Sequence, residues 1–99
     1  MYKRQDIKVK NMSTTNSNTA PNQFIIQGKD FEIFQSYNAI IVKQMLDGSG
    51  KTYLDENYWD YSSTTGKYRN IFLGEDKKAT LTKIASGEYL LVDLNKEVA

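Results

Sequence analysis

Cysteine and histidine are both absent from the 99-residue sequence. Without cysteine the chain can form no disulfide, no thiolate metal site and no thiol nucleophile. Without histidine it lacks the side chain best suited to proton transfer near neutral pH. We therefore expect no catalytic residues, no metal site and no cofactor, and a function in binding rather than in catalysis.

A large excess of charge of either sign is also missing, because 13 Lys and Arg residues face 12 Asp and Glu residues, for a net charge of +1. A protein that mimics DNA over its whole surface would carry a strong negative excess, and a general nucleic-acid coat protein a strong positive one. The composition fits neither class. Any electrostatic role of this protein must therefore be local.

Long hydrophobic runs are absent, and the sequence contains a single proline. No segment approaches the ~20 apolar residues of a membrane span, and the basic start is not followed by the apolar run of a signal peptide. We expect a cytosolic protein without a membrane role. The almost wholly polar residues 11–23 cannot bury enough apolar area to offset their ordering entropy. Residues 1–23 are predicted to be a flexible N-terminal arm, either a tether or an arm that orders on a partner.

The remaining residues predict one small α+β domain over 24–95, with a frayed tail at 96–99. Alternation of apolar and polar residues predicts four strands, over residues 24–27, 33–42, 51–54 and 89–94. Turn residues at 28–30 and 47–50 predict hairpin connections. The expected architecture is a small antiparallel sheet with two short helices, in the order β-β-β-α-α-β.

Capping residues mark both helices of the predicted domain. Possible N-caps at residues 62–65 precede a short helix that runs to Leu73, and Gly74 ends it. A second helix begins at Asp76 and closes at Gly87. In the first helix the spacing i, i+3, i+4 predicts a buried stripe of Tyr68, Ile71 and Phe72.

Two motifs resemble functional sites but favour ordinary turns. Gly48-Ser-Gly-Lys-Thr52 ends like a phosphate-binding loop, yet it lacks the first glycine and a following helix, so we interpret it as a hairpin turn. Asp55, Glu56 and Asp60 could bind a divalent cation or act as acid and base. No second cluster converges on them, and exposed turn residues explain them better.

The segment from Tyr58 to Arg69 has the composition of a binding surface. Large aromatic side chains stand close to positive charge there, a combination typical of interface hot spots and also of stacking on unpaired bases. In a domain this small, Trp59 is expected to belong to the core. The predicted partner-binding residues are Tyr58, Tyr61, Lys67 and Arg69.

Several longer segments resemble a group of small uncharacterised proteins from bacteriophages and prophages. The similarity spans about residues 9–75, and the segments that carry it are Ala20–Ile26, Phe34–Asn38, Ile40–Lys43, Tyr53–Ser62 and Thr64–Glu75. The resemblance assigns no reaction. It implies a small phage protein that binds a component of the host.

Three hypotheses follow from this resemblance. The first is a phage-encoded, non-catalytic inhibitor of a host defence system, namely an anti-CRISPR protein that binds a Cas effector nuclease or its ribonucleoprotein in the host bacterial cytoplasm. The second is a small phage protein that binds RNA or single-stranded nucleic acid. The third is a phage structural or assembly accessory protein. Direct contact with RNA and self-association stay open as further interactions.

Overall fold

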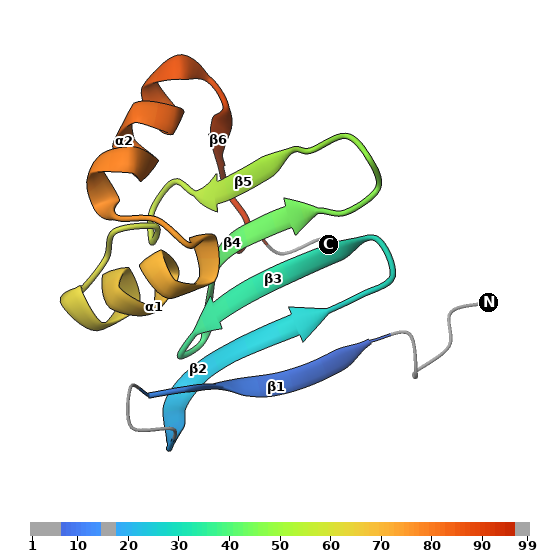
Figure 1. Ribbon diagram of the computed structural model, residues 1–99, viewed down its shortest axis with the longest axis vertical. Helices are drawn as coiled ribbons and strands as arrows, with labels where there is room; N and C mark the ends of the chain where they lie inside the picture. Colours follow the sequence, from blue (N-terminus) through green and yellow to red (C-terminus); the bar gives the residue numbers. More distant parts are fainter. Residues whose placement is uncertain (1–6, 15–17, 97–99) are drawn as a thin grey trace.

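One six-stranded sheet forms the body of the protein, and two helices connect its last two strands (Figure 1). The computed structural model describes residues 7–14 and 18–96. The elements in chain order are β1 (Lys8–Ser13), β2 (Thr19–Gln27), β3 (Phe31–Ser36), β4 (Ala39–Met45), β5 (Thr52–Asp55), α1 (Ser63–Leu73), α2 (Lys77–Ser86) and β6 (Tyr89–Val92). The α+β class predicted from the sequence is confirmed.

The strands lie side by side in chain order, from β1 at one edge to β6 at the other. Neighbouring strands up to β5 are antiparallel, because short turns join them. β6 is parallel to β5, since α1 and α2 return the chain to the end of the sheet where β5 begins. The sheet is therefore mixed, whereas the sequence predicted an antiparallel one.

The first two strands replace most of the predicted N-terminal arm. β1 pairs with β2, and Met12 and Ala20 are 6% and 0% exposed within the core. The prediction of a flexible arm is therefore wrong for residues 8–13 and 19–23, because a backbone ladder offsets the ordering cost even where most side chains are polar. Residues 1–6 and 15–17, also predicted to belong to the arm, and 97–99 of the predicted tail lie outside the described residues.

The long strand predicted over residues 33–42 is in fact a hairpin. β3 ends at Ser36 and β4 begins at Ala39, with Tyr37 and Asn38 as the turn. Tyr37 adopts a positive φ of 56°, and its N–H donates to the Asn22 carbonyl at 2.7 Å. Neither glycine nor proline marks this turn, and the apolar residues on both sides of it continue the pattern of a strand, so the sequence did not reveal it. The order is consequently β-β-β-β-β-α-α-β.

Both helices begin and end at the residues that the sequence indicated. Ser62 Oγ accepts the N–H of Thr65 at 3.1 Å, and Asp76 Oδ1 accepts the N–H of Ala79 at 2.8 Å. Gly74 and Gly87 close the helices with φ of 71° and 84°, a conformation that glycine adopts without steric cost. Neither of these described helices is long and apolar enough to cross a membrane.

Helix α1 packs against β3 and helix α2 against β6, whereas the β1–β2 hairpin extends away from both (Figure 1). The ring of Phe72 stacks on that of Phe34, with centroids 5.9 Å apart. Tyr68 is buried as predicted and Phe72 is half-buried, but Ile71 is 50% exposed. Arg69, which was not part of the predicted stripe, is buried instead, with 1% of its surface exposed.

The core position of Met12 gives a direct test of whether β1 belongs to the folded domain. Met12→Ala should lower the free energy of unfolding by about 2–5 kcal/mol, because it removes a buried side chain and leaves a cavity. Lys10→Ala, an exposed change on the same strand, should alter it by less than ~0.5 kcal/mol. Urea denaturation of the two variants measures both values. Equal and small effects would show that β1 is not part of the core.

Candidate functional site

The loop between β5 and α1 presents two tyrosines side by side. Tyr58 and Tyr61 are 36% and 62% exposed, and their rings meet edge to face with centroids 5.5 Å apart. A third tyrosine, Tyr37, comes from the β3–β4 turn and is 48% exposed. The three line one hollow of about 290 Å³, here called the tyrosine pocket, whose other lining residues are Ser36, Asn38, Ala39 and Asn95.

Asp55, at the end of β5, holds the loop that carries the first of these tyrosines. Its carboxylate is fully buried, and Oδ2 accepts the N–H of Asn57 at 3.0 Å and that of Tyr58 at 2.9 Å. The other oxygen, Oδ1, accepts the N–H of Leu94 at 2.8 Å. One side chain therefore joins the tyrosine loop to the segment after β6.

Asn95 continues this link and closes the wall of the tyrosine pocket. Its Oδ1 accepts the N–H of Ile40 at 2.8 Å, and its Nδ2 donates to the carbonyl of Ile40 at 2.9 Å. The carboxamide thus pairs with both backbone groups of one residue, as a neighbouring strand would. These two bonds fix the chain after β6 beside the start of β4, where the β3–β4 turn reaches the pocket.

Arg69, one of the predicted contact residues, is turned into the protein. Its Nη1 donates to the carbonyl of Trp59 at 2.7 Å and to Asp60 Oδ1 at 3.2 Å, and its Nη2 donates to Asn70 Oδ1 at 2.9 Å. The guanidinium lies 5.1 Å from the Trp59 ring centre, close enough for a cation–π contact. Arg69 therefore supports the loop from within, and its predicted role as a surface contact is withdrawn.

Lys67 is exposed on α1, with its ammonium 5.4 Å from the Tyr68 ring centre, and it does not line the tyrosine pocket. Of the four predicted residues, the structure thus brings together Tyr58 and Tyr61 alone. The sequence analysis missed Tyr37, Asn38 and Asn95. The first two lie within the segment that was predicted to be one continuous strand, and Asn95 has no motif around it. Trp59 packs against the core, as predicted.

Of the three carboxylates interpreted as exposed turn residues, Glu56 is exposed, but Asp55 is buried and Asp60 forms ion pairs. Asp60 accepts from Arg69 and, at 2.6 Å, from the ammonium of Lys77 at the start of α2. Burial by itself raises the pKa of Asp60, but the hydrogen bonds from Lys77 and Arg69 outweigh it and hold the pKa below its ordinary value. Among the described residues, no three acidic side chains are grouped in a way that could hold a metal ion.

The tyrosine pocket offers aromatic surface, phenol hydroxyls and carboxamides. Its lining residues carry no formal charge. Tyrosine rings provide large contact area with little loss of rotamer freedom, and their hydroxyls can hydrogen-bond at the edge of an interface. Such an arrangement can bind a partner by packing and neutral hydrogen bonds.

Comparison with known proteins gives a family without an assigned function. Residues 7–87 match the family of unknown function DUF8033, and because this match covers most of the chain, the chain belongs to that family. No curated protein and no solved structure matches it significantly.

The ion pair of Asp60 makes the stability of this loop depend on pH. Because its pKa is lower in the folded chain than the value of about 3.9 in an unfolded one, its carboxylate stabilises the fold above that pH and ceases to as pH falls through the folded pKa. Asp60→Asn should therefore lower the melting temperature by several degrees at neutral pH, and the difference should shrink toward zero in acid.

Thermal unfolding at a series of pH values measures this difference. Glu56→Gln, at an exposed position of the same loop, is the matched control and should leave the melting temperature unchanged at every pH. A constant deficit of Asp60→Asn from neutral pH into acid would contradict the ion-pair account.

Proposed function

We propose that this member of the DUF8033 family is a non-catalytic binding protein, and that its tyrosine pocket docks onto a protein partner. The observation that carries this proposal is the chemistry of the pocket, in which three partly exposed tyrosines meet without any charged lining residue. Interface hot spots are enriched in tyrosine, and their centres are depleted of charge.

The charges around the pocket favour a protein over a nucleic acid. Binding to a phosphate backbone requires lysine or arginine side chains that neutralise phosphates. The guanidinium of Arg69 is occupied by three bonds within the chain, and Lys67 stands outside the pocket. The loop also carries the exposed Glu56, whose negative charge would repel a phosphate backbone.

The partner that we propose is an effector nuclease of a CRISPR–Cas system, bound in the cytoplasm of a bacterial host. The resemblance to small phage proteins supports this proposal, and one of the segments that carry it, Tyr53–Ser62, includes Tyr58 and Tyr61. The net charge of +1 favours an inhibitor that covers one protein surface over one that imitates DNA. Such an inhibitor would act by occupying a surface of the nuclease, without any chemical step.

A plaque assay tests the biological part of this proposal. The protein is expressed in bacteria whose CRISPR–Cas system carries a spacer against the test phage, using one strain for each major effector type. We expect plaques to return in at least one strain. Restriction by CRISPR that stays complete in every strain would contradict the anti-CRISPR proposal.

The tyrosine pocket is tested on the purified effector from the strain that responds. Tyr61→Ala should weaken binding by at least roughly 30-fold, the equivalent of about 2 kcal/mol at a central contact. Ile71→Ala removes an exposed apolar side chain of α1 outside the pocket and should bind like the unaltered protein. Equal affinity of both variants would place the interface elsewhere.

A salt titration of the same complexes separates protein contact from contact with guide RNA. If the tyrosine pocket meets protein, Lys67→Ala should leave the salt dependence of binding unchanged. A fall of the slope by about one unit would show that Lys67 neutralises a phosphate and would favour the nucleic-acid hypothesis.

A further inference from the structure

The face of the sheet that faces away from α1 is unusually apolar. α1 covers the face that carries Phe34, as the stacked ring of Phe72 shows. On the opposite face, one row of paired positions crosses all six strands: Val9, Ile26, Ile33, Lys43, Tyr53 and Leu90. An antiparallel sheet that turns one face to water normally places polar residues there. In this row every residue except Lys43 is apolar or aromatic.

This row, here called the open row, is accessible at both ends and stands apart from the core. Val9 and Leu90 are 62% and 40% exposed, and the four residues between them are half-buried. None of the six belongs to the core cluster or to the side chains packed against it. Contiguous apolar surface of this kind marks an interaction site rather than a solvated face.

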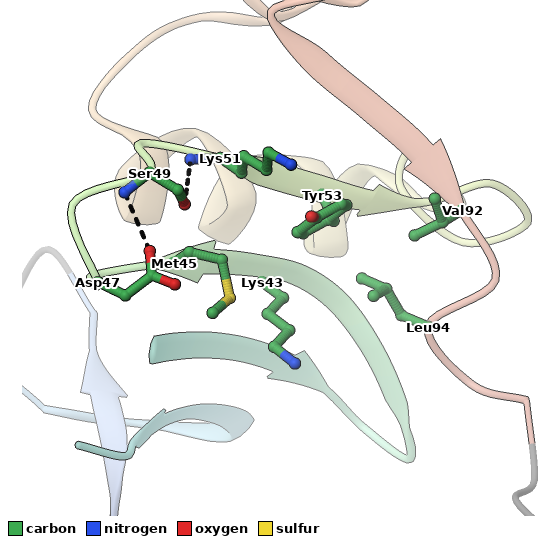
Figure 2. Close-up of a pocket in the computed structure, with 8 residues that line it drawn as sticks. All are labelled: Lys43, Met45, Asp47, Ser49, Lys51, Tyr53, Val92 and Leu94. Carbon is green, nitrogen blue, oxygen red and sulfur yellow. Dashed lines mark hydrogen bonds between the residues drawn. The ribbon is translucent and has the colours of Figure 1, made fainter. Parts of the chain in front are cut away.

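A second hollow, of about 460 Å³, opens beside the open row on β4, β5 and the segment after β6 (Figure 2). Apolar side chains line part of it, among them Met45, Val92 and Leu94, together with the ring of Tyr53. Lys43 on β4 and Lys51, just before β5, also line it, and Asp47 lies in the β4–β5 turn at one end (Figure 2). Hydrogen bonds from Ser49 hold the pKa of Asp47 below its ordinary value.

We propose that the open row and this hollow bind a second copy of the same chain. The apolar residues supply the contact, and the hollow supplies charges of both signs. In a symmetric dimer the same patch serves on both sides, so a contact between Asp47 of one copy and Lys43 or Lys51 of the other occurs twice. A nucleic acid or an acidic peptide would match the lysines but would leave Asp47 facing negative charge. This charge pattern favours the second copy.

The size of the sheet face sets the expected strength of this dimer. Five strand spacings of about 4.8 Å and strands of about six residues give a face of about 24 by 20 Å. That footprint, about 480 Å² on each partner, is smaller than the roughly 800 Å² that standard specific interfaces bury on each partner, and is typical of weak association. We therefore expect reversible association with a dissociation constant in the micromolar range, so that dilute protein is monomeric.

Sedimentation equilibrium over low micromolar to near-millimolar concentrations tests the proposal. The unaltered protein should shift from the monomer mass of 11.4 kDa toward twice that mass. Val9→Glu and Leu90→Glu place a charge at exposed ends of the open row, and each should weaken association at least about tenfold. Leu81→Glu is the matched control, because Leu81 is 46% exposed on α2, away from the sheet, and it should associate like the unaltered protein.

A charge exchange tests the proposed pairing within the hollow. Asp47→Lys should weaken association, because three lysines of one copy then meet three of the other. Adding Lys43→Glu to Asp47→Lys should restore it, since opposite charges face each other again. Circular dichroism verifies that every variant is folded.

The proposal would be overturned by a protein that stays monomeric at the highest concentration. It would be overturned equally by a dimer that tolerates Val9→Glu and Leu90→Glu. Tyr61→Ala, in the tyrosine pocket, should dimerise normally, so the failure of either proposal can be recognised separately.

Discussion

The buried carboxylate of Asp55 is the interaction on which the candidate site depends. It accepts three backbone N–H groups, two from the loop that carries Tyr58 and one from Leu94 in the segment after β6. These hydrogen bonds join parts of the chain that lie far apart in sequence. The side chain of Asn95 then forms two hydrogen bonds with the backbone of Ile40. These bonds hold the segment after β6 against the start of β4 at the wall of the tyrosine pocket.

Ion pairs within the protein position the loop that forms the uncharged tyrosine pocket. Arg69 and Asp60 pair with each other and with loop and helix groups, and these contacts shape the loop between β5 and α1. What reaches the solvent at the tyrosine pocket is therefore aromatic and neutral. This arrangement supports our proposal that the segment, whose composition suggests both protein and nucleic-acid binding, binds a protein. The opposite face of the sheet, where charges of both signs lie near apolar side chains, is the surface that we propose for self-association.

Local chemistry decided how much of the fold and the site could be predicted. The caps Ser62 and Asp76 and the turns at 28–30 and 47–50 are signalled by adjacent residues, and the structure confirms them. The turn at Tyr37 depends on a distant acceptor, the carbonyl of Asn22, so no nearby residue announces it. The burial of Arg69 likewise depends on the position of Trp59, which only the folded loop provides. Contacts between segments that lie far apart in the sequence could not be predicted from the sequence alone.

Amide hydrogen exchange in Asp55→Asn tests the central role of this carboxylate. The account predicts that the amides of Asn57, Tyr58 and Leu94 are protected in the unaltered protein. In the variant an NH₂ group replaces one of the two accepting oxygens, so either the amide of Leu94 or those of Asn57 and Tyr58 should exchange much faster. The amide of Val42, in the sheet interior, should keep its protection. Unchanged exchange at Tyr58 and Leu94 in a folded variant would contradict the account.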